Sequence, residues 1–66
     1  MKSIYIEIRE KNSRSYPCLV ADLGYTQRVI SYDRALIYEV SPVPVAEMLN
    51  APVGNKYFLL GGNDNA

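Results

Sequence analysis

Tyrosine is the residue type whose number in this chain suggests chemistry, and that chemistry is binding rather than catalysis. The 66 residues include one phenylalanine and no tryptophan, but six tyrosines, at Tyr5, Tyr16, Tyr25, Tyr32, Tyr38 and Tyr57. A hydrophobic core prefers leucine, isoleucine and phenylalanine, because a buried phenol needs a hydrogen-bond partner. Tyrosine and arginine are enriched at protein interfaces. The alternative is that these are ordinary strand residues, since tyrosine has a high β propensity.

The groups that catalysis or a metal centre needs are sparse. The chain has no histidine, the commonest general base near neutral pH, so the single Cys18 has no histidine to activate it. One thiol cannot form a closed zinc site, and the apolar neighbours of Cys18 predict a buried core residue. Asp22 and Asp33 fit a turn and a helix cap, although a functional carboxylate pair stays open as the alternative. We therefore expect no enzyme, no cofactor and no metal.

Charge and length limit the function classes further. Seven basic residues balance seven acidic ones, and a neutral chain has no overall field that draws it to phosphates. No apolar run approaches the ~18 residues of a membrane span, and the charged, alternating N-terminus is unlike a signal peptide. A lone thiol without an export signal predicts the cytoplasm. A single domain of this size is marginally stable, so a homodimer is one way to add stability.

Three strands are expected in the first half of the chain. Residues 3–9 alternate between Ile4, Ile6 and Ile8 on one side and polar or aromatic residues on the other. Residues 10–15 are polar and predict a mobile loop. Residues 16–21 form the next strand, with Pro17 at its start or at a sheet edge. Gly24 supplies the positive φ of a turn at residues 22–25, and residues 25–32 return as the third strand.

Two short helices and a last strand are expected after that. Asp33 is a helix N-cap for residues 34–40, although alternation over residues 35–40 also fits a strand. The prolines at 42 and 44 end this helix, and Pro44 opens a second one that reaches residue 50. Residues 51–55 are a loop, residues 56–60 a strand, and residues 61–66 a disordered tail.

The predicted fold is a single α+β domain over residues 1–60. Its elements follow the order β-β-β-α-α-β, with a small antiparallel sheet of three to four strands and one or two short helices on one face. The predicted core comprises Ile4, Ile6, Ile8, Leu19 or Cys18 with Val20, Ile30, Leu36, Ile37, Val40, Met48, Leu49, Phe58 and Leu60.

The predicted binding surface is the sheet face opposite the three isoleucines. Tyr5 and Arg9 alternate with those isoleucines, and Tyr57 joins them if Phe58 and Leu60 point inward. Tyr25 and Arg28 flank this face from the central hairpin. The partner-binding residues are therefore predicted to be Tyr5, Arg9, Tyr25, Arg28 and Tyr57.

Two functions follow from this surface. The first is a non-catalytic protein-binding domain, of the kind common among accessory proteins of bacteriophages and mobile elements, which inhibits or modulates a host protein by occluding a surface. The alternative is a small protein that binds single-stranded nucleic acid by stacking bases on tyrosine, with nearby lysine and arginine for the phosphates. The partner's identity and the oligomeric state do not follow from the sequence.

Overall fold

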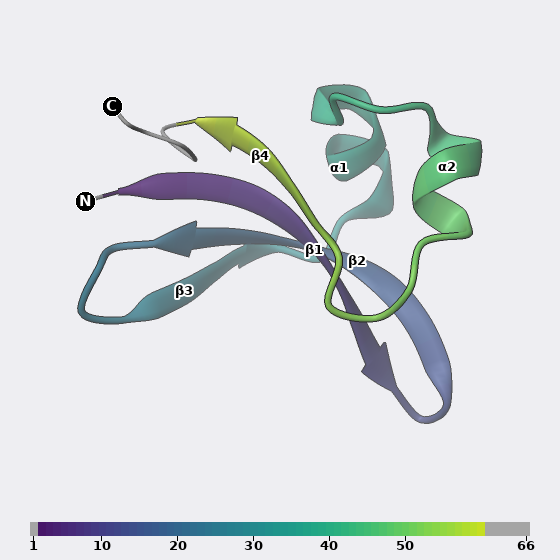
Figure 1. Ribbon diagram of the computed structural model, residues 1–66, viewed down its shortest axis with the longest axis horizontal. Coiled ribbons are helices and arrows are strands. Elements are labelled where there is room, and N and C mark those ends of the chain that lie inside the picture. The colour runs from purple at the N-terminus through teal and green to yellow at the C-terminus, as the bar shows by residue number, and fades with distance from the viewer. Residues whose placement is uncertain (1, 61–66) are drawn as a thin grey trace.

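The computed structural model, described for residues 2–60 apart from the side chain of Leu60, is an α+β domain (Figure 1). Its elements are β1 (Ser3–Lys11), β2 (Arg14–Asp22), β3 (Gln27–Ser31), α1 (Arg34–Val40), α2 (Val45–Leu49) and β4 (Lys56–Leu60). The four strands form one antiparallel sheet in the order β3-β2-β1-β4. The predicted fold class and element order are confirmed. The tail predicted at residues 61–66 lies outside the described residues.

The turn between β1 and β2 is tighter than the sequence predicted. The loop expected over residues 10–15 is wrong, because the two strands pair as far as Lys11 opposite Arg14. Asn12 and Ser13 alone connect them, with φ values of 54° and 65°. Positive φ at both central residues is the requirement of a two-residue hairpin turn that matches the strand twist. Asparagine tolerates this conformation, so the polar segment closes a hairpin instead of forming a loop.

The second turn follows the sequence prediction closely. Gly24 has a φ of 94°, and its amide donates to Oδ1 of Asp22 at 2.9 Å. The amide of Leu23 donates to the carbonyl of Thr26 at 2.9 Å, which closes the hairpin. β3 then begins at Gln27 and is shorter than the strand predicted over residues 25–32.

Pro17 lies in the middle of β2 rather than at its start, and the other predicted place, a sheet edge, is confirmed. Ile8 is its partner on β1, and the backbone of Ile8 exchanges hydrogen bonds with Gly54 and Asn55 on the other side. The nitrogen of Pro17 therefore points away from β1, where a ladder would need a third strand. β3 pairs only with residues from Leu19 onward, so no strand flanks Pro17 there. The proline thus costs the sheet no hydrogen bond.

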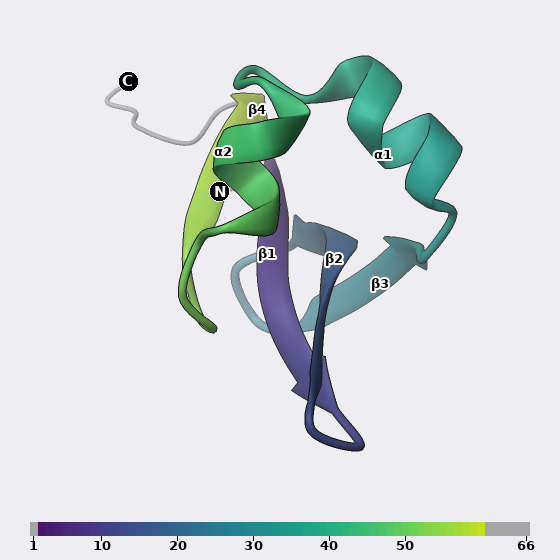
Figure 2. The same ribbon diagram turned by 90° about the vertical axis from the view of Figure 1, so that its right-hand side faces the viewer.

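Both helices lie on the same side of the sheet (Figures 1 and 2). The amide of Ala35 donates to Oδ1 of Asp33 at 3.0 Å, so Asp33 is the predicted N-cap and residues 34–40 are helical rather than extended. α2 begins after Pro44, whose carbonyl accepts the amide of Met48 at 3.1 Å. Each helix is short, and each buries one side chain fully.

The main core lies between the sheet and the helices. It consists of Ile6, Ile8, Leu19, Ile37 and Met48, all of them predicted. Five other predicted core residues are between 39% and 59% exposed, namely Ile30, Leu36, Val40, Leu49 and Phe58. Helices of seven and five residues present too little length to turn more than one side chain each fully inward.

A second buried cluster lies on the opposite side of the sheet, without a helix over it. It contains Tyr5, Cys18 and Val20, with Tyr16 and Val29 packed against it. Cys18 and Val20 therefore share a face, and Leu19 lies on the other. The sequence left open whether Leu19 or Cys18 with Val20 is buried, and all three are buried. Tyr5, predicted to face water, is the residue that the sequence misplaced in this cluster.

Candidate binding surfaces

Strand pairing assigns each strand residue to one of the two sheet faces. The face without helices is called the open face below. Its central row runs across all four strands as Phe58, Tyr5, Val20 and Val29. The next row contains Lys56, Glu7 and Cys18, followed by Arg9 with Tyr16 and then Lys11 with Arg14. The helix-covered face carries the alternate residues, because successive side chains of a strand point to opposite sides.

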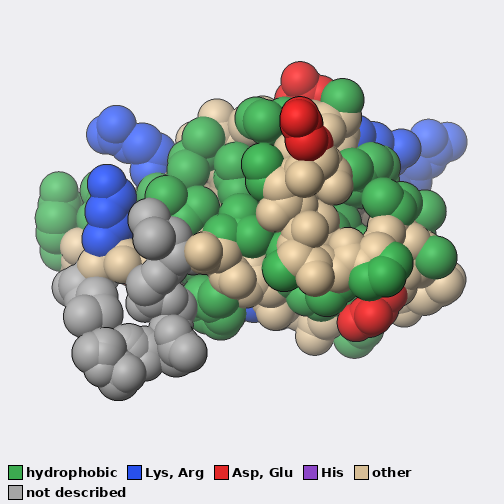
Figure 3. All heavy atoms as spheres, turned by 90° about the horizontal axis from the view of Figure 1, so that it is seen from above, with side chains coloured by type: hydrophobic (Ala, Val, Ile, Leu, Met, Phe, Trp, Pro, Cys, Tyr) green, Lys and Arg blue, Asp and Glu red, His purple; other side chains and the backbone are tan. Residues whose placement is uncertain are grey.

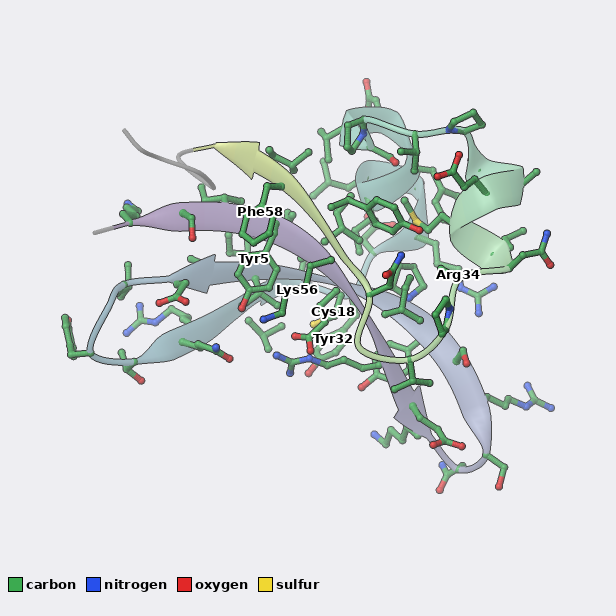
Figure 4. All side chains as sticks on the ribbon, in the orientation of Figure 1. Tyr5, Cys18, Tyr32, Arg34, Lys56 and Phe58 are labelled. Atoms are coloured by element: carbon green, nitrogen blue, oxygen red, sulfur yellow. The ribbon has the colours of Figure 1, made fainter. Side chains whose placement is uncertain are left out.

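Tyr5 fills the centre of the open face and is only 1% exposed. Its ring centroid lies 5.1 Å from that of Phe58, and the Nζ of Lys56 lies 5.0 Å from the Tyr5 ring centroid (Figure 4). The Tyr5 hydroxyl is buried without a hydrogen-bond partner. Burial, followed by the nearby charge of Glu7, raises the pKa of this phenol. Tyr5 is therefore a core residue, and its predicted exposure to a partner is wrong.

Tyr57 also departs from its predicted position. It pairs with Ile6 on the helix-covered face, where it is partly buried against the main core. Its hydroxyl accepts a hydrogen bond from Nδ2 of Asn55 at 2.9 Å. Phe58 instead occupies the open face opposite Tyr5. The sequence prediction placed Tyr57 on the face of Tyr5 and Phe58 on the other face. A shift of one residue in the alternation of a strand moves every side chain to the opposite face.

The other three predicted residues lie at separate places. Arg9 is on the open face, and its Nε and Nη2 donate to the same oxygen of Glu7, each at 3.0 Å. Tyr25 is 87% exposed at the tip of the second hairpin. Arg28 pairs with Ala21 on the side of the sheet that carries Ile4. The five predicted residues therefore do not form one surface, and the role of these three in binding stays a prediction.

An aromatic pair that the sequence reading did not single out lies near the β1–β2 hairpin. The rings of Tyr16 and Tyr32 have centroids 5.7 Å apart and are tilted by 42°. With Lys11 they line an open hollow of about 320 Å³. Cys18 is fully buried and lies next to Tyr32 (Figure 4), and burial raises the pKa of its thiol. The alternation of Tyr16, Cys18 and Val20 along β2 was the sequence signal that indicates one shared face for these three residues.

A second candidate surface is formed by the helices. Four aliphatic side chains there are between 37% and 59% exposed, and together they are called the helical apolar surface: Leu36, Val40, Val45 and Leu49. Leu36 and Val40 have the i, i+4 spacing that places both residues on one side of a helix, and so do Val45 and Leu49. Figure 3 shows hydrophobic side chains gathered over much of the side on which the helices lie, with both acidic and basic groups beside them.

Charge is divided between these surfaces although the chain is neutral overall. The segment from residue 35 to residue 55 carries two charged residues, Glu39 and Glu47, and none of the seven basic residues. Lys11, Arg14 and Lys56 all lie on the open face, together with the paired Arg9 and Glu7. α1 begins with Arg34, so the helical layer carries two acidic residues and one basic residue, whereas the open face has an excess of cations.

Within residues 2–60, no three acidic or cysteine side chains are grouped closely enough to hold a metal ion. None of the helices described is long and apolar enough to cross a membrane. Asp22 accepts a backbone amide in a turn opposite the start of β3, and Asp33 accepts one in a helix cap after the end of β3, so they do not form a carboxylate pair. No protein-family model, curated protein or solved structure matches the chain.

Proposed function

We propose that this chain is a small non-catalytic protein-binding domain whose partner docks on the helical apolar surface. The observation that carries the proposal is the number of exposed aliphatic side chains on two helices that each bury a single residue. Isolated apolar residues are common on protein surfaces, but a contiguous apolar patch marks an interaction site. This location replaces the sheet face that the sequence indicated.

The energetics of the helices support this location. Helices shorter than about 12 residues are marginal in water and depend on the packing of an apolar face. α1 has seven residues and α2 has five, and each is held by one fully buried side chain, Ile37 or Met48. A partner that covers Leu36, Val40 and Leu49 would supply the missing contacts. Binding would then stabilise the helical layer as well as the complex.

The size of the domain fits a function by occlusion. A stable interface buries about 800 Å² on each partner. The chain exposes 4410 Å², so such an interface would cover close to a fifth of it. A domain of this kind would inhibit or modulate another protein by covering a surface, as accessory proteins of bacteriophages and mobile elements do.

The chemical groups favour a non-catalytic role in the cytoplasm. Cys18 is buried, and its raised pKa keeps the thiol protonated near neutral pH, so it is a poor nucleophile. The carboxylates of Asp22 and Asp33 are engaged with backbone amides. A free buried thiol suits a reducing compartment.

The test compares two substitutions of similar type on different surfaces. Leu49→Lys places a charge within the helical apolar surface, and Ile30→Lys places one at an apolar residue of β3 that is similarly exposed. Both proteins serve as baits beside the wild type in cell extract, with captured proteins quantified by mass spectrometry. We expect the partner to be captured by wild type and Ile30→Lys and lost by Leu49→Lys.

Two results would contradict the proposed location. One is a partner that Leu49→Lys retains in full. The other is a partner lost with Tyr25→Ala or Arg28→Ala, the exposed residues that the sequence indicated. Light scattering on the wild type and on Leu49→Lys tests whether a second copy of the chain occupies the helical apolar surface. A mass of twice 7.4 kDa that Leu49→Lys halves would show that the partner is a second copy of the chain.

A further inference from the structure

We infer that the open face is a second binding site, and that its ligand is single-stranded nucleic acid. The inference rests on a group of cations without acidic partners, a pair of tyrosine rings of which one is exposed and one partly buried, and a hollow lined by those rings and a lysine. It uses residues that are separate from the helical apolar surface, so it stands or falls independently of the proposed protein partner.

The cations come from successive rows of the sheet. Lys56 lies opposite Glu7, and Lys11 lies opposite Arg14 at the end of the hairpin. Glu7 is already engaged, because it forms the only ion pair among residues 2–60, with Arg9. Lys56, Lys11 and Arg14 are therefore without an acidic partner in the described part of the chain.

The hairpin end carries a cost that an anion would relieve. Like charges directly opposite each other on paired strands destabilise the sheet. Lys11 and Arg14 have this arrangement, and the turn residues Asn12 and Ser13 hold the two strands in register. A phosphate group between the two side chains would turn the repulsion into two favourable contacts.

The aromatic pair supplies what a nucleobase needs. Tyr32 is 56% exposed and Tyr16 is partly buried beside it, so at least one ring face is accessible. The hollow lined by these rings and Lys11, at about 320 Å³, is at the lower end of the range for small-ligand pockets. Bases of any type stack on exposed tyrosine, while neighbouring lysine and arginine contact the backbone phosphates.

The combination favours a single strand over the other anionic ligands. An acidic peptide would satisfy the cations but has no planar group that requires the two rings. A duplex offers phosphates, but its bases are stacked on each other and are not free to stack on protein. From Glu7 to Lys11 the strand advances by about 13 Å, so the cations can follow the backbone of a few nucleotides.

The experiment titrates labelled oligothymidine into the protein at about 50 mM and about 200 mM salt. The double variant Lys11→Ala/Arg14→Ala removes two cations of the open face. The control Lys2→Ala/Arg28→Ala removes the same charge from outside it. We expect wild type and control to bind with a steep salt dependence. The slope of log affinity against log salt should fall by about 1.4 in the double variant, since each phosphate contact contributes roughly 0.7 for single strands.

A second pair of variants tests the rings. Tyr32→Leu removes a stacking partner and keeps an apolar side chain, and Tyr25→Leu makes the same change at the other hairpin. Loss of one stacked base weakens binding by roughly tenfold or more, so Tyr32→Leu should show this loss and Tyr25→Leu should not. Thermal unfolding of each variant establishes that it is folded.

Three results would overturn the inference. Wild type that fails to bind at low salt has no such site. An equal loss in the control variants means that the binding is a general charge effect and does not use the open face. A duplex that binds as tightly, or polyglutamate that competes as well as the oligonucleotide, assigns the face to a different ligand.

Discussion

The two faces of the sheet bury their side chains by different means. On the helix-covered face, aliphatic side chains such as Ile6 and Leu19 pack beneath residues of α1 and α2. On the open face, Tyr5 is buried by its own neighbours, since Phe58 packs beside its ring and Lys56 lies over it. The difference shows that a sheet can bury one row of residues without a covering layer, provided that long side chains lean across the row.

The two methods leave different groups at the surface. The helical layer is too short to bury its own apolar residues, so aliphatic side chains remain exposed beside Glu39 and Glu47. The open face buries its apolar centre and leaves cations and two tyrosine rings around it. One domain therefore presents two chemically distinct surfaces, which its neutral net charge does not reveal.

The largest expected effect is the loss of packing on the helix-covered face. Ile6 is fully buried at the centre of the main core, so Ile6→Ala should reduce the free energy of unfolding by about 2–5 kcal/mol. A domain of this size has roughly 3–10 kcal/mol in total, so a large fraction of the variant should be unfolded. Urea denaturation measures both values.

The comparison with the open face needs a variant of an equally buried residue, with the loss taken per carbon removed. Val20 is equally buried on that face, and Val20→Ala should cost roughly 1.5 kcal/mol, about 0.8 for each carbon removed. The neighbouring side chains there have no helix above them and can move into the space. Ile6→Ala removes three carbons and Val20→Ala two, so a greater loss per carbon from Val20→Ala would mean that the main core lies on the open face.

Tyr5→Phe should stabilise the protein. The Tyr5 hydroxyl is buried without a partner, so its removal recovers the cost of taking it out of water, about 1 kcal/mol. Equilibrium unfolding in urea at neutral pH gives the difference. A loss of more than about 1 kcal/mol would instead show that the hydroxyl has a hydrogen-bond partner in solution.

The same variant should change the dependence of stability on pH. Burial raises the pKa of the Tyr5 phenol above its ordinary value of 10.0, so the folded state favours the neutral form. The stability linked to this group is complete below pH 10 and is lost as the pH rises through the raised pKa. Tyr5→Phe should keep this stability. Cys18→Ala measures the part of the pH dependence that comes from the thiol. Burial raises the pKa of that thiol too, so its contribution to stability also falls at high pH.

Ser13→Gly should stabilise the hairpin that carries the cations. Ser13 has a φ of 65°, which costs an L-residue roughly 1 kcal/mol and costs glycine almost nothing. The change also creates Asn-Gly, the pair preferred in this turn. We expect the free energy of unfolding to rise by about 0.5–1 kcal/mol, with oligonucleotide affinity unchanged. Destabilisation would mean that the turn has another conformation in solution.

Lys11→Glu is expected to have the smallest effect on stability. It is informative because it separates a role of Lys11 in binding from a role in the fold. It replaces a like-charge pair with Glu opposite Arg14, which is worth about 0.5 kcal/mol of added stability. It should also weaken oligonucleotide binding, because it removes a cation from the open face. Stability and binding would thus move in opposite directions. A variant that loses both would indicate that Lys11 supports the fold rather than a ligand.

The fold was predictable because its local signals agree. The alternation of Ile4, Ile6 and Ile8, the positive φ of Gly24 and the cap at Asp33 each describe their own neighbourhood, and each prediction is confirmed. The prolines at 42 and 44 separate the helices as expected. The loop predicted over residues 10–15 failed because composition shows polarity but does not show that two residues suffice for the turn.

The candidate surfaces were less predictable because they depend on contacts between strands. Tyr5 alternates like an exposed residue, and only the pairing that brings Phe58 and Lys56 beside it accounts for its burial. The phase of β4 is ambiguous within a short apolar run, so Tyr57 was placed on the wrong face. Leu36 and Val40 have core spacing, but they are 39% and 40% exposed, because the seven-residue α1 buries only Ile37 fully.

The central claim is that Tyr5 is buried at the centre of the open face by the side chains beside it, Phe58 and Lys56. NMR of protein labelled with ¹³C in its tyrosine rings tests this claim directly, because the ring signal reports ionisation of the phenol. With the protein still folded at pH 10.0, the ordinary pKa of tyrosine, the Tyr5 signal should remain mostly that of the neutral phenol. A Tyr5 phenol already half ionised at or below that pH would be in contact with water, and the described arrangement of the open face would be wrong.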